Sequence, residues 1–228
     1  MGEEFVEIVK DTTCKVCGRK LKLRLSKKYV GSIKTFPFPY KWVHGEPPHV
    51  AVIYLDRDFN ESFQRSIEID PRDSAKWNNV GWIFIGLGKH RKAIECFEKA
   101  LEIDPNFAHA WVAMGDTYRK QGNKSRAIEC YKKSIELDPK YPYTQNALGI
   151  VYAKLGENAK AIESFEKALG INIEYLITWH NLGNNYEKTG RIEKAIDCYE
   201  TILKFDPDYD IAKKALKRAI KKSSASPE

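Results

Sequence analysis

The sequence predicts a mainly α-helical protein, in which an α-solenoid of stacked helix pairs follows a small N-terminal β module. Two observations predict the solenoid. One set of glycines recurs in equal steps of 34, at Gly81, Gly115, Gly149 and Gly183. One set of alanines recurs with the same step, at Ala93, Ala127, Ala161 and Ala195. Self-similarity at this period is the signature of helix pairs that stack on one another.

The first helix of each pair is clearest in the fourth period. Three of its residues share one helix face at i, i+3 and i+7 spacing, namely Trp179, Leu182 and Tyr186. Gly183 has no side chain, so a partner helix can approach closely there. Gly190 suits the positive φ with which many helices end. The pattern therefore predicts a helix, a tight turn at Gly190 and a second helix.

The second helix has an equally regular pattern. Ala195, Tyr199 and Ile202 form its inward face. Pro207 follows and ends the helix, because proline cannot continue one.

Together these residues resemble the tetratricopeptide repeat. Those that follow the family pattern are Trp179, Leu182, Gly183, Tyr186, Ala195, Tyr199 and Pro207, with Tyr199 in place of phenylalanine. The resemblance implies a right-handed superhelix of four helix-turn-helix repeats, at residues 74–107, 108–141, 142–175 and 176–207. The third repeat departs from the pattern, with Gln145 for tryptophan and Ile173 for proline. We expect a looser exit from that repeat.

Two segments flank the four repeats. Residues 58–73 resemble the second helix of a repeat without its first, with Phe63 and Pro71 in phase, and we expect a linking half-repeat helix. Residues 208–222 form a predicted capping helix with a polar outer side, which a solenoid needs at its exposed end. Its inward residues are Ile211, Ala215, Leu216 and Ala219. We expect residues 223–228 to form a disordered tail.

Residues 74–207 contain no recurring catalytic constellation and no phosphate-binding glycine loop after a strand. The resemblance implies a concave groove lined by the first helix of each repeat, which binds a protein or peptide partner. Its ligand-facing positions are Asn78, Trp82, Ile85, His109, Val112, Asp116, Arg119, Tyr143, Asn146, Ile150, His180, Asn184 and Glu187. Alternatively, Trp82 and Ile85 pack against the preceding half-repeat.

Some family members bind the C-terminal carboxylates of chaperones with a Lys/Asn/Arg clamp. The corresponding positions hold Asn78 and Trp82 in the first repeat, and Tyr143 and Ala147 in the third. The cations of the clamp are missing, so we exclude that ligand. A mixed polar and apolar groove suits an extended or helical peptide with a few apolar anchors.

The cysteines divide into two groups. Cys96, Cys130 and Cys198 share one repeat position, where a thiol serves as a small packing residue. Cys14 and Cys17 form a close pair in the N-terminal residues 1–57. We predict that this pair, with His44 and His49, holds a structural zinc in a zinc-ribbon-like β module. The alternatives are a redox dithiol at Cys14 and Cys17, and two surface imidazoles.

The β module is predicted from alternation in residues 20–25, and from the apolar segments at 49–55 and 5–9. Between them an aromatic stripe occupies every second position, at Phe36, Phe38, Tyr40 and Trp42. Pro37 and Pro39 confine this segment to a sheet edge or a polyproline-like path. We expect its rings to cover the small core or to dock on the first helices of the solenoid.

Charge permits a second function. The chain has a net charge of +7, and residues 1–50 hold 10 Lys/Arg against 5 Asp/Glu. The aromatic stripe lies near several cations, namely Lys27, Lys28, Lys34 and Lys41. Nucleic-acid binding by this basic module is therefore the alternative function.

The opening residues have no signal-peptide core, and the longest apolar segments are too short to span a membrane. We expect a cytoplasmic, non-enzymatic adaptor that binds a protein or peptide in the groove of its repeats.

Overall fold

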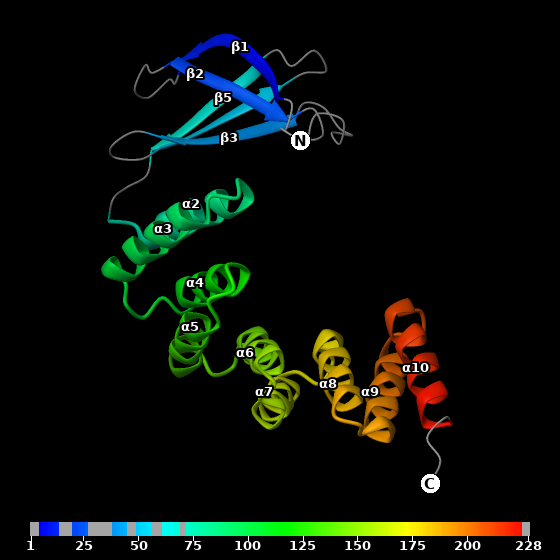
Figure 1. Cartoon of the computed structure of the whole chain (residues 1–228). Helices are drawn as coiled ribbons and strands as arrows, with labels where there is room; N and C mark the ends of the chain where they lie inside the picture. Colours follow the sequence, from blue (N-terminus) through cyan, green and yellow to red (C-terminus); the bar gives the residue numbers. More distant parts are fainter. Residues whose placement is uncertain are drawn as a thin grey trace. The chain divides into compact units, whose positions relative to one another are not determined.

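A computed structural model describes the side chains of residues 72–224 and, before them, the backbone of residues 5–13, 20–26, 38–44, 49–55 and 61–68. The chain divides into two compact units, Met1–Ile103 and Asp104–Glu228. Figure 1 shows the chain coloured from its N-terminus to its C-terminus.

The strands of the first unit form two antiparallel sheets. The smaller pairs β1 (Phe5–Thr13) with β2 (Lys20–Ser26). The larger has the order β3 (Phe38–His44), β4 (His49–Leu55) and β5 (Glu61–Glu68). Strands therefore occupy the segments predicted at 5–9, 20–25 and 49–55. Strand β3 is at an edge of its sheet, which is one of the two paths that the prolines of this segment allow.

The predicted half-repeat helix at 58–73 is wrong over Glu61–Glu68. These residues form β5, which pairs antiparallel with β4 from Leu55↔Glu61 to His49↔Glu68. Phe63 and Ile67 are four residues apart, a spacing that fits both the 3.6-residue period of a helix and the two-residue period of a strand. Pairing with β4, which the local pattern does not show, decides between the two.

The first unit ends with one helix pair, α2 (Ser74–Gly86) and α3 (His90–Ile103). The Asp73 side chain caps α2 by accepting a 3.0 Å hydrogen bond from the amide of Lys76. Trp82 of α2 is 45% exposed and lies edge-on to Phe97 of α3, with ring centroids 6.2 Å apart.

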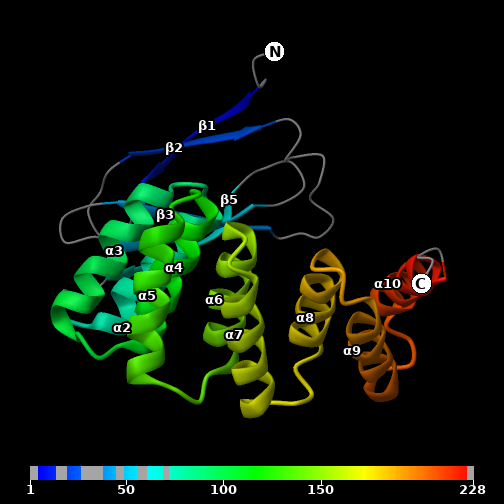
Figure 2. The same ribbon diagram turned by 60° about the horizontal axis from the view of Figure 1, so that its bottom comes forward.

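The second unit contains three further helix pairs and a last helix, which follow one another in Figures 1 and 2. In order they are α4 (Ala108–Lys120) with α5 (Lys124–Leu137), α6 (Pro142–Leu155) with α7 (Asn158–Ile171), α8 (Leu176–Lys188) with α9 (Ile192–Phe205), and α10 (Asp210–Ser223). Each helix packs on the next in sequence. In residues 72–224 the structure is thus an all-α array of helix pairs, and no helix there is long and apolar enough to cross a membrane.

The repeated glycines allow the two helices of a pair to approach closely. A Cβ atom added to Gly149 of α6 would lie 2.6 Å from Cε1 of Phe165 in α7, and one added to Gly183 would lie 2.6 Å from Cε1 of Tyr199. The inward face predicted for the second helix is confirmed, because Ala195, Tyr199 and Ile202 are all fully buried.

The turn inside each pair ends the first helix at a glycine with positive φ. Gly190 has φ 75°, and the next amide, of Arg191, donates to the carbonyl oxygen of Tyr186 at 2.9 Å. This geometry confirms the turn predicted at Gly190.

The looser exit expected from the third repeat does not occur in this geometry. Asn172 takes the place of an aspartate found in the other repeats, and its Oδ1 accepts from the amide of Glu174 at 2.9 Å. Trp179 Nε1 donates to the carbonyl oxygen of Ile173 at 2.8 Å, as Trp111 Nε1 does to Pro105 at 3.1 Å. The contact needs only a carbonyl group, so isoleucine supplies it as well as proline does.

The last helix, α10, packs on α9 through alanines. Ala212, Ala215 and Ala219 are buried, whereas Ile211 is 55% exposed. The prediction that Ile211 faces inward is therefore wrong, because the buried face begins one residue later, at Ala212. A helix that approaches its neighbour closely enough to bury alanines leaves little room for isoleucine.

Candidate binding face

The first helices of successive pairs contact one another directly. We call the surface carried by α4, α6, α8 and α10 the inner face of the second unit. Three side-chain hydrogen bonds join successive members of this set: Tyr143 to Asp116, Asn181 to Asn146, and Arg218 to Glu187. The sequence-predicted residues on these helices therefore belong to one continuous face.

Asp116 is the centre of a polar cluster between α4, α5 and α6. Its Oδ1 accepts a 2.7 Å hydrogen bond from the Tyr131 hydroxyl and a 3.0 Å bond from Nη2 of Arg119. Its Oδ2 accepts from the Tyr143 hydroxyl. Asp116 is only 6% exposed, so these donors replace the water that the carboxylate would otherwise bind.

The protonation states of this cluster follow from burial and from its charges. Burial, with the negative charge of Asp116 beside it, raises the pKa of Tyr131 and of Tyr143. Burial acts to lower the pKa of Arg119, but its contacts with Tyr131 and Asp116 outweigh this effect and raise it. Both phenols therefore remain hydrogen-bond donors and Arg119 remains a cation.

A run of rings extends from this cluster along the N-terminal ends of α4 and α6. Phe107 and His109 have ring centroids 6.3 Å apart, His109 and Tyr141 5.3 Å, and Tyr141 and Tyr143 5.7 Å in a stacked arrangement. His109 is exposed and the others are partly buried. The hydroxyl of Tyr143 is held by Asp116, so the polar cluster fixes one end of this aromatic run.

The inner side chains alternate in polarity from one repeat to the next. The first and third repeats place apolar groups at three equivalent positions, namely Trp82, Ile85 and Phe97, and then Ile150, Ala153 and Phe165. The second and fourth repeats place polar groups at the same positions, namely Asp116, Arg119 and Tyr131, and then Asn184, Glu187 and Tyr199. Within the second unit, an apolar step thus lies between two polar steps.

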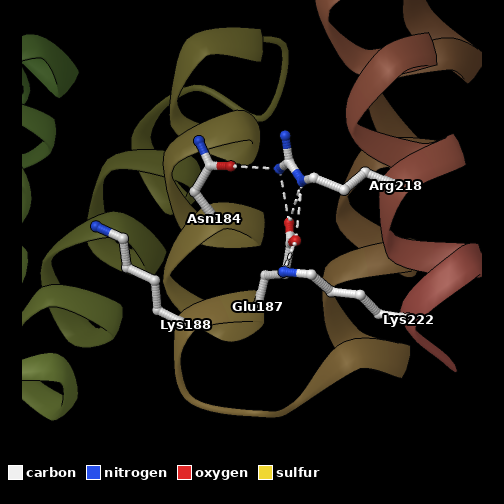
Figure 3. A pocket seen from close by; sticks show the side chains of 5 residues that line it. All are labelled: Asn184, Glu187, Lys188, Arg218 and Lys222. Atoms are coloured by element: carbon white, nitrogen blue, oxygen red, sulfur yellow. Dashed lines mark hydrogen bonds and ion pairs between the residues drawn. The ribbon is translucent and has the colours of Figure 1, made fainter. Parts of the chain in front are cut away.

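The fourth repeat contributes to a pocket of about 260 Å³ that α8 and α10 form together. Its lining residues, drawn in Figure 3, are Asn184, Glu187, Lys188, Arg218 and Lys222. Glu187 accepts a 2.7 Å hydrogen bond from Nη2 of Arg218 and another of 2.7 Å from Nζ of Lys222. The side chain of Glu187 is 5% exposed, whereas those of Arg218 and Lys222 are 50% and 54% exposed.

The pocket is positively charged. Hydrogen bonding from Arg218, which outweighs burial, and from Lys222 lowers the pKa of Glu187 to about 2, so this group is a carboxylate at neutral pH. The lining residues include one carboxylate, Glu187, and three cations, Lys188, Arg218 and Lys222, which gives them a net charge of +2 (3 − 1). Burial and the positive charge of Arg218 lower the pKa of nearby His180, so that ring is neutral at pH 7.

A second pocket of about 340 Å³ lies between α7, α8 and α9. Its lining residues include Trp179, Tyr186, Glu166 and Asp197. Lys194 already places its ammonium 5.6 Å from the centroid of the Tyr186 ring. The aromatic ring of this pocket therefore already has a cation of the protein, Lys194, as its neighbour.

The predicted ligand-facing residues differ widely in exposure. Those with less than a tenth of their surface exposed are Asn78, Val112, Asp116, Asn146 and Glu187. Trp82 and His109 are exposed, and the remaining members are intermediate, namely Ile85, Arg119, Tyr143, Ile150, His180 and Asn184. The buried polar members orient their neighbours, and the exposed ones offer surface to a partner.

Sequence reasoning missed the cations of the pocket, because α10 was assigned only a capping role. A signal was present in the spacing of the repeats. Arg218 follows Asn184 by one full period, and Lys222 follows Lys188 by the same step. Continued into α10, the repeat register therefore places Arg218 at the ninth position, where Asp116 and Asn184 stand in their own repeats.

The predicted zinc ligands lie outside the residues whose side chains are described. Cys14 and Cys17 fall in the connection between β1 and β2, and His44 and His49 are in β3 and β4. Within residues 72–224, no group of three or more His, Cys, Asp or Glu residues is arranged to hold a metal. Cys96, Cys130 and Cys198 are buried there, at most 5% exposed, which agrees with a packing role.

Stacked helix pairs with this internal period define the chain as an α-solenoid repeat protein. Models of the tetratricopeptide repeat match residues 74–107, 96–129, 115–156 and 141–208. The chain is a tetratricopeptide-repeat protein. No curated protein matches it at a significant level.

Several solved structures are similar to the chain. MamA is 26% identical with a TM-score of 0.61, over 66% of this chain and 82% of MamA. YrrB, described as a TPR protein with an unusual peptide-binding site, is 18% identical with a TM-score of 0.57, over 68% of this chain and 80% of YrrB. The first TPR of Spaghetti (RPAP3), bound to the HSP90 peptide SRMEEVD, is 25% identical with a TM-score of 0.50, over 52% and 96%. The likeness to YrrB shows the fold alone.

Proposed function

We propose that the chain is a non-enzymatic adaptor that binds a peptide or a protein segment along the inner face of its repeats. In this proposal the repeats form a right-handed tetratricopeptide superhelix, and the inner face is its concave groove. The observation that carries the proposal is the continuous inner face, in which side chains of α4, α6, α8 and α10 are joined by hydrogen bonds. The repeat fold is typically non-catalytic. Two similar structures are described by their peptide-binding site or bound peptide.

The chemistry of the face suits an extended segment. Exposed or half-exposed rings such as His109, Tyr141 and Tyr143 supply rigid contact area at little cost in side-chain entropy. Asn184 and Arg119 present polar groups that can bond to a peptide backbone. Ile150 lies between these polar steps and offers an apolar contact for one side chain of the ligand.

The test is a selection of binders from a heptapeptide library on the full-length protein, followed by affinity measurements with variants. His109→Ala and Ile150→Ser alter the inner face, whereas Lys133→Ala is a matched change on the outer helix α5, where Lys133 is 51% exposed. We expect the inner variants to weaken binding of a selected peptide about tenfold, because loss of one anchor costs more than about 1 kcal/mol. Equal affinities for all three variants would contradict the proposal.

We also propose a structural zinc at Cys14, Cys17, His44 and His49. The observation in its favour is the register of β3 and β4, in which His44 and His49 are direct partners at the end of the hairpin. Thiolate and imidazole are ligands that zinc prefers. Elemental analysis should find about one zinc per chain, and Cys14→Ser and His44→Ala should each lose it. A reversible dithiol without metal would instead favour the redox alternative.

The basic N-terminal residues are the ground for nucleic-acid binding as the alternative function. It predicts a salt-sensitive mobility shift of a single-stranded oligonucleotide by the full-length protein, weakened by Lys27→Gln and Lys28→Gln together. No shift at low salt would rule this alternative out.

A further inference from the structure

The pocket between α8 and α10 has a charge and a position that the general binding function leaves unexplained. Three cations line it, and two of them, Arg218 and Lys222, come from a helix whose ordinary task is to cover the end of the array. We propose that this pocket is an anion subsite, which takes one carboxylate or phosphate group of a peptide bound along the inner face. The proposal rests on the peptide-binding function proposed above.

The first ground is the way in which Glu187 holds the cations. Arg218 and Lys222 both donate to the Glu187 carboxylate, so their head groups are fixed rather than spread in solvent. Figure 3 shows one terminal nitrogen of Arg218 directed away from Glu187, and the Lys188 ammonium directed away from it as well. The buried carboxylate thus positions two cations without neutralising the pocket.

The second ground is exposure. Half of each side chain of Arg218 and Lys222 is open to solvent, although Glu187 beneath them is buried. A second anion can therefore approach the same cations from the open side without displacing Glu187. Glu187 already accepts from Nε and Nη2 of Arg218, so the second anion would bind to Nη1 of Arg218 and to the ammonium group of Lys222.

The third ground is charge complementarity beyond the pocket itself. Helix α10 carries six Lys/Arg and a single acid, Asp210, whereas its neighbour α9 carries two Lys/Arg and three Asp/Glu. A lysine-rich outer side would be enough to keep a capping helix soluble. Arg218 and Lys222 are instead directed toward α8, where Asn184 accepts a 3.3 Å hydrogen bond from Arg218.

This pocket differs from the chaperone carboxylate clamp, whose positions in the first and third repeats lack cations here. The anion subsite belongs to the fourth repeat and the capping helix. A peptide that follows the inner face toward the C-terminal end of the array would therefore meet the polar step of the second repeat, then the apolar step at Ile150, and last the cations of the pocket.

The experiment selects binders from a library of N-acetylated heptapeptides that contains phosphoserine and has both free and amidated C-termini. We expect the full-length protein to enrich Asp, Glu, phosphoserine or a free C-terminus at one position. The Arg218→Gln/Lys222→Gln variant should lose this enrichment and bind the selected peptides about tenfold or more weakly. The matched Lys217→Gln/Lys221→Gln variant removes the same charge from α10 outside the pocket and should keep it.

A further variant separates anion binding from loss of structure. Glu187→Gln keeps a side-chain oxygen that can accept from Arg218 and raises the net charge of the pocket to +3. Measured at neutral pH and at a temperature where this variant stays folded, it should strengthen binding of the acidic peptides about two- to fivefold. A variant that merely loosened α10 would weaken binding instead. The unselected amidated peptides without acidic groups serve as the reference for each variant.

The outcomes distinguish the two proposals. Acidic enrichment that persists in Arg218→Gln/Lys222→Gln would overturn the anion subsite and leave the peptide-binding function standing. Enrichment of apolar residues alone would do the same. If the wild-type protein retains no peptide at all, the binding function falls, and the anion subsite falls with it. Comparison of the peptides with phosphoserine, with acidic side chains and with a free C-terminus identifies which of these anionic groups the pocket binds.

Discussion

The close approach of paired helices at Gly149 predicts a large loss of stability from a single methyl group. In the Gly149→Ala variant the new Cβ would lie 2.6 Å from Cε1 and 2.7 Å from Cδ1 of Phe165, where ordinary contact begins at 3.4 Å. The ring must move by about 0.8 Å (3.4 − 2.6), and it cannot move into solvent because Phe165 is only 1% exposed.

Two opposing free energies set the expected result. Overpacking of a buried site costs about 1–3 kcal/mol, and a displacement of this size belongs near the upper end. Alanine gains about 1 kcal/mol over glycine in a helix. We therefore expect Gly149→Ala to lower the free energy of unfolding by about 1–2 kcal/mol.

The assay is urea unfolding followed by circular dichroism at 222 nm. Gly170→Ala is the matched control, because Gly170 lies near the end of α7 and an added Cβ would have no neighbour within 4 Å. It should stabilise the protein by about 0.5 kcal/mol. In a double variant, Phe165→Leu should relieve part of the Gly149→Ala cost, since the clashing ring is gone. A Gly149→Ala protein as stable as the wild type would refute the close approach.

Three other predictions concern buried polar groups. The pKa of Glu187 falls from 4.5 to about 2 on folding, so its ion pairs stabilise the protein above pH 4.5, and this stability is lost as the pH falls toward 2. The full pKa shift corresponds to about 3 kcal/mol of stability, and we expect a contribution of about 1–2 kcal/mol because Arg218 and Lys222 are half exposed. In urea unfolding measured at several pH values, Glu187→Gln should remove this pH dependence. Tyr131→Phe should cost about 1–2 kcal/mol, because Asp116 loses a donor while the ring still packs, and a cost equal to that of Tyr131→Ala would contradict this reasoning. In a Cys14→Ser/Cys17→Ser protein, the thiols of Cys96, Cys130 and Cys198 should resist Ellman's reagent at pH 8, because burial raises their pKa to about 11 or 12. Fast labelling would show that these thiols are accessible and would contradict the prediction.

The helix pairs could be predicted from the sequence because the same pattern of residues recurs in each of the four repeats. Ala195 and Tyr199 lie where the period places them, and the positive φ of Gly190 follows from its place after a helix. Strand β5 could not be predicted in this way. Its Phe63 and Ile67 fit either period, and the pairing with β4 that decides the matter joins residues distant in sequence.

The pocket was hidden for a different reason. Lysines on a terminal helix are ordinarily explained by solvation, and that explanation is sufficient for Lys217 and Lys221. It is insufficient for Arg218, because a residue at the ninth position of a repeat belongs to the inner face. The hydrogen bonds from Arg218 and Lys222 to Glu187 show that the capping helix contributes to that face as well as covering the end of the core.

One position of the second helix connects the packing of each helix pair with the polar groups of the inner face, depending on whether it holds phenylalanine or tyrosine. The ring that fills the space beside the repeated glycine is phenylalanine in the first and third repeats and tyrosine in the second and fourth, namely Phe97, Tyr131, Phe165 and Tyr199. The phenylalanines have no hydroxyl group, and Phe97 lies edge-on to Trp82. The tyrosine hydroxyls reach the inner face, where Tyr131 bonds to Asp116 and Tyr199 lies 2.9 Å from Oδ1 of Asn184 and 3.2 Å from Oε2 of Glu187. The same residue therefore packs the helix pair and orients the polar groups above it, so the polarity of each step on the face is set from within the core.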